Sequence, residues 1–503
     1  MNTKLITVYE RSRAQRFAPK TAFADFAPER NGHMMENNKT YKYSRYLSPL
    51  DVWAISFGCT IGWRAFIMPG STFLPAAGTL GSLIGIAISA AVMLIIGANV
   101  SYLMRNMPGT GGIYTYTKEA LGRNNAFICT WFLTLSYLAI LLVNAVSLMT
   151  IVRTIFGDRL KFGYSSYNIA GNVVSLGEIG VSMIALACIG LLFINAKPFL
   201  QHLQTILAVL MLAGVLVVAL FCLQHLGNLR DLFSVSESFG MQGNSRPLAV
   251  LSIVMLTPLV FFGFESASLE TVHFKFKETK SRWIIAISLL LSALVYIALT
   301  LISVSSAPDG YASWQTYIAD LDKMSGLQAV PSFFSAKAVM GDVGLWIIAF
   351  AALAAVLTSM IAAYRTTTRM LATMAENHII SESFVKTNNG IMIIMVAAML
   401  ISILGKNIID SFMNLASLGA VITFAYTSLS AWKLARRNGS GLCAITGVVG
   451  ALVSVALGVI SLIPNLTSVQ TMDKKALLLL AVWCVLGLLF YLVTSARSGR
   501  NAE

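Results

Sequence analysis

The sequence predicts an all-α membrane protein with about twelve transmembrane helices, and its composition is the first evidence. Of its 503 residues, 56% are hydrophobic and only 12% are charged, whereas a soluble domain carries roughly 25% charged residues. Apolar runs of about 20 residues, the length of a membrane-crossing helix, follow one another from residue 51 to residue 496. Because lipid provides no hydrogen-bond partner for the backbone, these runs are expected to be helical.

Polar connections and connections that contain Gly or Pro divide the apolar part into two groups of six expected spans. The first group comprises 51–76, 81–104, 126–155, 178–195, 199–224 and 248–271. The second group comprises 284–305, 343–374, 391–405, 408–434, 443–463 and 476–496. The aromatic residues of the long outer connection, 306–342, predict short helices that pack on the outer face as a lid.

Both ends of the chain are polar and are expected in the cytoplasm. Residues 1–48 contain no apolar stretch of the kind a signal peptide needs, so we expect a flexible cytosolic tail before a transmembrane domain at 49–496. Residues 497–503 are expected to form a cytosolic C-terminus. The net charge of +14 comes from Lys and Arg that concentrate in the tail and the predicted cytoplasmic loops. This bias is typical of a multi-pass protein of the cell membrane.

The composition also narrows the expected partners. The six Cys residues lie in or beside predicted spans without metal-site spacing, and the five His residues are scattered. We therefore expect no disulfide-linked partner, no zinc site and no enzyme. The expected partners are the lipid bilayer and a small-molecule substrate, without nucleic acid.

Two of the expected spans carry helix-breaking residues together with a charge. The first contains Gly58, Gly62 and Arg64, and the sixth contains Gly263 and Glu265. Interrupted helices at corresponding positions of two halves indicate an inverted-repeat transporter with a binding site near the membrane midplane. The halves are expected at about 51–224 and 248–434, followed by two extra helices within 443–496.

Four sequence motifs carry a family resemblance. Residues 58–70 read GCTIGWRAFIMPG, residues 107–122 read MPGTGGIYTYTKEALG, residues 261–265 read FFGFE, and residues 368–377 read TRMLATMAEN. These segments resemble the signatures of the amino acid/polyamine/organocation (APC) superfamily of permeases, although Arg64 replaces the third glycine of the first signature. The resemblance implies two inverted five-helix repeats plus two C-terminal helices, and a secondary transporter that moves an amino acid or related amine by alternating access. A polyamine or other organic-cation permease stays open, as do a membrane nutrient sensor and a channel.

A broken helix would expose N–H groups on one side of the gap and C=O groups on the other, which suits a zwitterion. The expected substrate-binding residues are Thr60, Ile61, Gly62, Trp63 and Arg64, facing Phe262, Gly263, Phe264, Glu265 and Ser266. An alternative is that the glycines only permit close helix packing. Arg64 is expected either to bind an acidic substrate group or, preferably, to form an ion pair with Glu265.

Further side chains are candidates for gating and for coupling. Phe264 and Tyr137 are candidate gate residues, although aromatic residues at helical spacing often serve only in packing. Asn144 and Ser136 are expected either to line the site or to form interhelical hydrogen bonds.

No cofactor is expected other than a coupling ion, Na⁺ or H⁺, and exchange without an ion also stays open. The resemblance implies a possible sodium site at Gly58, Ile61, Ala355, Thr358 and Ser359, whose hydroxyls could instead bond to their own helix. Many proton-driven relatives carry a Lys in the fifth helix, where this sequence has Met211; a proton would then need Glu265, His202 or His273.

Overall fold

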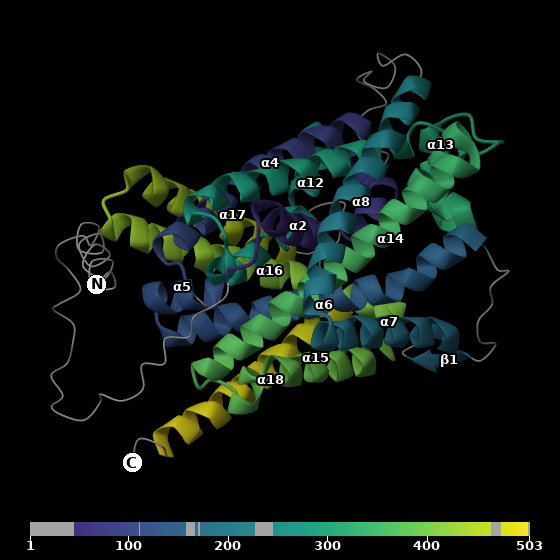
Figure 1. Ribbon diagram of the computed structural model, residues 1–503. Helices are drawn as coiled ribbons and strands as arrows, with labels where there is room; N and C mark the ends of the chain where they lie inside the picture. Colours follow the sequence, from purple (N-terminus) through teal and green to yellow (C-terminus); the bar gives the residue numbers. More distant parts are fainter. Residues whose placement is uncertain are drawn as a thin grey trace, which may run out of the picture. The chain divides into compact units, whose positions relative to one another are not determined.

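The computed structural model describes residues 45–109, 111–156, 166–169, 172–226, 245–463 and 474–500. It is built almost entirely of helices (Figure 1). The elements of the first half are α2 Pro49–Thr60, α3 Trp63–Met68, the π-helical turn η1 Pro69–Phe73, α4 Leu74–Asn106, α5 Gly112–Leu121, α6 Arg123–Phe156, β1 Ser166–Ile169, β2 Asn172–Ser175, α7 Leu176–Asn195 and α8 Lys197–His225. The following elements are α10 Arg246–Val254, α11 Thr257–Phe261, the 3-10 helices η3 Phe264–His273 and η4 Glu278–Lys280, α12 Ser281–Ser303, α13 Trp314–Ala319, η5 Leu321–Lys323, η6 Gly326–Ala329, α14 Pro331–Glu376, η7 Glu382–Val385, α15 Thr387–Ser402, α16 Lys406–Arg437, α17 Gly441–Leu462 and α18 Lys474–Arg500.

The expected multi-pass helical architecture is confirmed. Ten helical segments within the described residues are long and apolar enough to cross a membrane, and α15 is a shorter apolar helix. The count differs from twelve because residues 63–106 form one segment that contains parts of the first two expected spans, bent at Gly78, whose φ is 62°. The twelve-helix inverted-repeat arrangement stays a prediction.

A small β-hairpin departs from the expected all-α fold. Strands β1 and β2 pair in antiparallel register, with Ser166 opposite Ser175 and Tyr167 opposite Val174. The hairpin lies in the connection between α6 and α7, and the Tyr167 hydroxyl donates to the carbonyl of Ile403 just after α15. Short polar connections lack the long apolar period that predicts spans, so this hairpin was not expected from the hydrophobic pattern.

The tail residues that the structure describes are joined to η3. The N–H groups of Tyr46 and Leu47 donate to the carbonyl of His273, and the N–H of Lys275 donates to the carbonyl of Leu47. The flexible tail was expected to extend to residue 48, but residues 45–48 belong with the helical bundle by these bonds. Residues 1–44, which make up the rest of that tail, lie outside the described residues.

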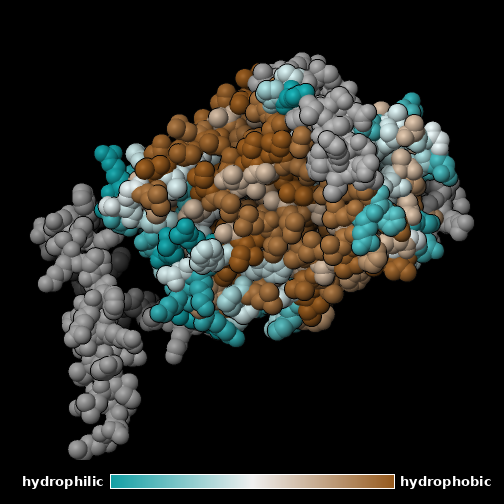
Figure 2. Space-filling view, turned by 90° about the horizontal axis from the view of Figure 1, so that it is seen from above, coloured by the Kyte–Doolittle hydropathy of each residue, from teal (hydrophilic) through white to brown (hydrophobic). Residues whose placement is uncertain are grey.

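The surface and the burial pattern fit a bilayer. Figure 2 shows hydrophobic residues across the middle of the visible face and hydrophilic residues towards its two ends. Helix α6 lies centrally, with 78% of its apolar window buried, whereas only 11% of the corresponding window of α18 is buried. Helices such as α18 therefore expose apolar side chains on their surface, as contact with lipid requires. In Figure 1, α5 and α13 lie towards opposite ends of the bundle, called here the α5 end and the α13 end.

Glycine permits the close contact between α16 and α6. A Cβ atom added at Gly419 would lie 2.4 Å from the Ser136 hydroxyl oxygen and 2.7 Å from the Phe132 carbonyl oxygen. Ser136 itself donates to the carbonyl of Ala416, 2.8 Å away. Ser136 was expected either to line the site or to form an interhelical hydrogen bond, and it forms the interhelical bond.

Replacing Gly419 by Ala is expected to destabilise the protein by about 1–3 kcal/mol, because the two helices must separate to admit the methyl group. Thermal unfolding of the purified protein in detergent measures the effect. Gly180→Ala in α7 is the control, since an added Cβ there meets no atom within 4 Å. Equal unfolding midpoints for the two variants would contradict the proposed packing role of Gly419.

Candidate functional site

The first expected span is interrupted at its middle. Helix α2 ends at Thr60, Ile61 and Gly62 are extended with φ of −100° and −125°, and α3 begins at Trp63. In a continuous helix the N–H of Trp63 would donate to the carbonyl of Cys59, four residues earlier. That bond is missing from the backbone hydrogen bonds of the described residues. The interruption therefore frees peptide groups in the interior of the bundle, as the sequence predicts.

The sixth expected span is interrupted opposite the first. Helix α11 ends at Phe261, Phe262 is extended, and Gly263 adopts a left-handed conformation with φ of 116° before η3 begins. A Cβ atom at Gly263 would lie 2.8 Å from both the carbonyl carbon and the oxygen of Cys59. Two features therefore require glycine at position 263: the left-handed backbone conformation and the direct contact between the two interruptions.

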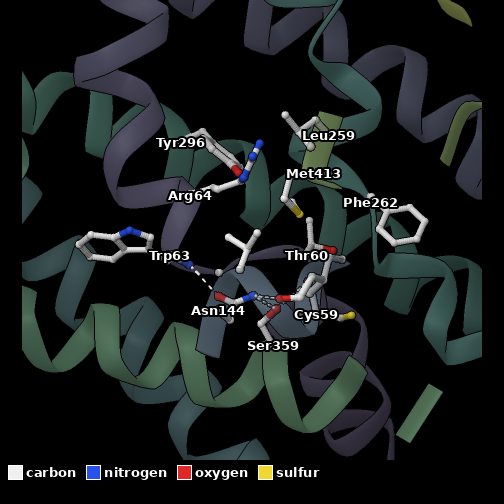
Figure 3. A pocket seen from close by; sticks show the side chains of 13 residues that line it. Cys59, Thr60, Trp63, Arg64, Asn144, Leu259, Phe262, Tyr296, Ser359 and Met413 are labelled. Atoms are coloured by element: carbon white, nitrogen blue, oxygen red, sulfur yellow. Dashed lines mark hydrogen bonds between the residues drawn. The ribbon is translucent and has the colours of Figure 1, made fainter. Parts of the chain in front are cut away.

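A pocket lies beside these interruptions (Figure 3). Its cavity volume is about 30 Å³, which is room for one or two water molecules. Its lining comes from the first span, α6, the α11 region, α12, α14 and α16. The lining residues are Cys59, Thr60, Gly62, Trp63, Arg64, Ile140, Val143, Asn144, Leu259, Phe262, Tyr296, Ser359 and Met413.

Half of the ten expected substrate-binding residues line this pocket, namely Thr60, Gly62, Trp63, Arg64 and Phe262. The other five are buried but are not among the lining residues, namely Ile61, Gly263, Phe264, Glu265 and Ser266. Substrate binding by either set stays a prediction. The structure brings the two expected segments together, because both interruptions meet at Cys59.

The chain matches the family model described as "Amino acid permease" over residues 47–490. The chain belongs to the amino acid permease family. The match covers nearly all of the helical bundle and includes both interruptions, in agreement with the APC resemblance.

Three curated relatives resemble the permease at low identity. The branched-chain amino acid permease BcaP of Lactococcus lactis subsp. cremoris (strain MG1363) is 22% identical over 472 residues, covering 90% of this chain and 95% of the relative. The methylthioribose transporter of Bacillus subtilis (strain 168) is 22% identical over 60% of this chain and 64% of its own length. The vacuolar cationic amino acid transporter 4 of Arabidopsis thaliana is 24% identical over 59% of this chain and 49% of its own length.

The preferred ion pair between Arg64 and Glu265 is not formed. Among the described residues, no ion pair joins these two side chains. One carboxylate oxygen of Glu265 accepts from the Tyr137 hydroxyl at 2.9 Å, and the other accepts from the Gly263 N–H at 3.0 Å. The turn at Gly263 directs Glu265 towards α6, whereas Arg64 lies near Tyr296 in the pocket (Figure 3).

Aromatic side chains surround the interruptions of the permease on two sides. The ring of Tyr137 lies 4.9 Å from that of Phe262, and the ring of Phe264 lies 5.8 Å from that of Phe424. The ring of Phe333, from the start of α14, lies 6.0 Å from that of Trp63. Phe333 comes from the connection that was expected to form an outer lid. A gating role for Tyr137 and Phe264 stays a prediction.

The possible sodium site shows hydroxyl groups that already have partners. Thr358 donates to the carbonyls of Ala354 and Ala355 in its own helix, at 2.8 and 3.0 Å, as the alternative interpretation expects. Gly58 is packed against it, since an added Cβ would lie 2.9 Å from the Cβ of Thr358. Occupation by sodium stays a prediction.

A polar group of α8 that was not expected from the sequence also contacts this region. The side-chain amide of Gln204 donates to the Thr358 carbonyl at 3.4 Å. Met211, which was expected to stand where proton-driven relatives carry a Lys, lies seven residues later in the same helix, and that correspondence stays a prediction. Tyr296 and Met413 were missed as well, because an isolated Tyr or Met within an apolar run gives no sequence signal of a pocket.

Replacing Gly263 by Ala is expected to lower substrate affinity at least about tenfold, because the added Cβ would push the two interruptions apart. Gly310→Ala provides a matched control: Gly310 has a φ of 95°, but an added Cβ meets no atom within 4 Å. In both variants the Ala residue is strained by its positive φ, and only Gly263→Ala adds the clash with Cys59. The substrate affinity is measured from the concentration dependence of uptake by proteoliposomes, normalised to folded protein, and the difference between the variants gives the effect of the clash. Retained affinity in folded Gly263→Ala protein would contradict the role of this contact.

Proposed function

We propose that the permease is a secondary active transporter that moves an amino acid or related amine across the cell membrane by alternating access. The observation that carries the proposal is the pocket beside two touching helix interruptions in a membrane bundle. Peptide groups around such a pocket provide donors for a carboxylate and acceptors for an ammonium group. Two of the relatives are named for branched-chain and cationic amino acids, which supports the same substrate class.

The distribution of charge supports a cytoplasmic α5 end. Basic residues lie in the connections between α4 and α6, between η3 and α12, between α14 and α15, and between α16 and α17, or at the helix ends beside these connections. They include Arg105, Lys118, Arg123, Lys275, Lys277, Lys280, Arg282, Lys386, Arg436 and Arg437. Because short cytoplasmic loops carry an excess of Lys and Arg, this arrangement favours both termini in the cytoplasm.

A network at the α5 end supports a closed cytoplasmic path. The guanidinium of Arg369 in α14 contacts the carboxylate of Glu270 in η3 at 2.7 Å and donates to the Tyr46 hydroxyl at 3.2 Å. Only 1% of the Glu270 side chain is exposed. The network ties the half-helix η3 to α14 and to the chain before α2. Its separation would open the pocket towards the cytoplasm, which is the motion that alternating access requires.

A polyamine or other organic-cation permease is the second candidate, and the charge of the pocket disfavours it. Among the described residues that line the pocket, Arg64 is the charged one. Two like charges about 4 Å apart repel by roughly 4 kcal/mol at an effective dielectric constant of 20. A substrate with a carboxylate is therefore favoured over one that carries only positive charge.

The function is tested by thermal-shift screening of the purified permease against amino acids and amines, followed by uptake of the hits into proteoliposomes. Saturable uptake with counterflow and a dependence on a sodium or proton gradient is expected. Conductance without saturation would indicate a channel, and binding without uptake would indicate a sensor. Either result would overturn the proposal.

Replacing Arg64 by Gly is expected to relax selection against cationic substrates, with the uptake ratio of cationic to acidic amino acids rising at least about tenfold. Arg64→Lys keeps the charge and serves as the control for it, although it loses the bidentate geometry of guanidinium. Competition of unlabelled amino acids against a transported hit gives the profile. An unchanged profile in Arg64→Gly would remove Arg64 from substrate recognition.

The coupling ion is expected to be revealed by two matched substitutions. If protons drive uptake through Glu265, Glu265→Gln abolishes accumulation under a proton gradient while exchange of substrate persists, because the amide cannot release a proton. If sodium drives uptake, Thr358→Val removes a hydroxyl ligand and raises the sodium concentration needed for half-maximal uptake. Uptake is measured with each gradient imposed alone. Unaltered accumulation in both variants would contradict both coupling routes.

A further inference from the structure

The two peptide groups that lose their mutual hydrogen bond at the first interruption both have side-chain partners. The N–H of Trp63 donates to the side-chain oxygen of Asn144 in α6 at 3.1 Å. The carbonyl of Cys59 accepts from the hydroxyl of Ser359 in α14 at 3.4 Å. A continuous helix would join these same two groups directly, because they are four residues apart.

The two side chains are themselves linked. The side-chain nitrogen of Asn144 donates to the Ser359 hydroxyl oxygen at 3.1 Å. The donors therefore follow one direction: Trp63 N–H to Asn144, Asn144 to Ser359, and Ser359 to the carbonyl of Cys59 (Figure 3). Asn144 and Ser359 are only 5% and 1% exposed, so water does not compete freely for these bonds.

We propose that Asn144 and Ser359 are positioning residues whose relay replaces the missing Trp63–Cys59 main-chain bond and holds the first span open beside the pocket. A relay of two side chains separates the ends of the missing bond, whereas a direct bond would restore helix and fill the gap. Buried polar groups gain most when every member of a network is satisfied. The relay meets that condition for both freed peptide groups.

Gly62 is the residue that lets Asn144 enter the gap. A Cβ atom at Gly62 would lie 2.7 Å from the side-chain oxygen of Asn144 and 3.1 Å from its side-chain nitrogen. Gly62 has an extended backbone with φ of −125°, so its conformation alone does not demand glycine. Glycine is needed at this position because a side chain would occupy the space that Asn144 fills.

The relay also determines which peptide groups face the substrate, an implication that rests on the proposed function. Because the Trp63 N–H and the Cys59 carbonyl serve the relay, a carboxylate would meet the N–H of Gly62, for which the described residues provide no hydrogen-bond acceptor. An open gap in the free protein would also spare the substrate the cost of breaking a helix. Loss of the relay would lower the populated fraction of binding-competent protein and weaken apparent affinity by that fraction.

The first test needs no substrate and consists of a double-mutant cycle on thermal unfolding. Asn144→Ala and Ser359→Ala are each expected to lower the unfolding midpoint, and the double variant is expected to be no less stable than the worse single variant, because either change breaks the same relay. The control cycle combines Asn144→Ala with Ser428→Ala. Ser428 accepts from Asn99 at 3.2 Å in a separate contact between α16 and α4, so these shifts should add. Additive shifts for Asn144 and Ser359 would overturn the relay.

The second test measures the dissociation constant of the amino acid or amine that stabilises the wild-type permease most. Asn144→Ala and Ser359→Ala are each expected to raise it about tenfold or more, while Ser359→Thr, which keeps the hydroxyl, stays within about threefold of wild type. Asn99→Ala is the control for loss of a buried Asn, and it should lower stability without changing affinity. Unchanged affinity in both relay variants would overturn the positioning role.

Two further arms separate competing explanations. Gly62→Ala should weaken substrate binding in the wild-type background. In the Asn144→Ala background it should weaken binding little further, since the side-chain oxygen of Asn144 that the added Cβ would meet is gone. An affinity loss that appears only with sodium, and only in Ser359→Ala, would make Ser359 an ion ligand and overturn the relay. If no amino acid or amine binds wild type, the proposed function fails, and the substrate-free cycle still decides on the relay.

Discussion

A membrane-embedded peptide group must find a hydrogen-bond partner, and this constraint governs the centre of the permease. Two spans abandon their helical bonds at the same place, where the carbonyl of Cys59 lies against Gly263. The freed groups are distributed between side chains of neighbouring helices and a pocket. The breaks persist because α6, α14 and the carboxylate of Glu265 supply alternative partners.

The same constraint connects the site to movement. Beyond Gly263 the chain continues as the ten-residue 3-10 helix η3, an unusually long run of that geometry. Glu270 of this helix is tied to Arg369, and its start is held to α6 through Glu265 and Tyr137. Helix η3 thus runs from the second interruption, whose Phe262 lines the pocket, to the network at the α5 end, so a solute that shifts this interruption would also bias that network.

The apolar pattern predicted six helices closely, since α6, α7, α8, α12, α16 and α17 begin and end within a few residues of expectation, but it did not predict that α14 begins as early as Pro331 or that residues 63–106 form one segment. Gly and Pro with a charge likewise predicted both interruptions. Side-chain partners were beyond prediction, because they depend on packing between distant segments: Glu265 pairs with Tyr137 of α6, 128 residues away, instead of with Arg64. Asn144 was one of several polar residues of α6, and only the approach of Gly62 distinguishes it.

Hydrogen–deuterium exchange of the purified permease, with and without a stabilising amino acid, tests most directly whether the two interruptions form the binding site. The account predicts that peptides covering 60–64 and 261–265 exchange faster than the centre of α6 in the free protein, and that the amino acid slows both. Exchange in these peptides as slow as in α6, and unchanged by the amino acid, would contradict it.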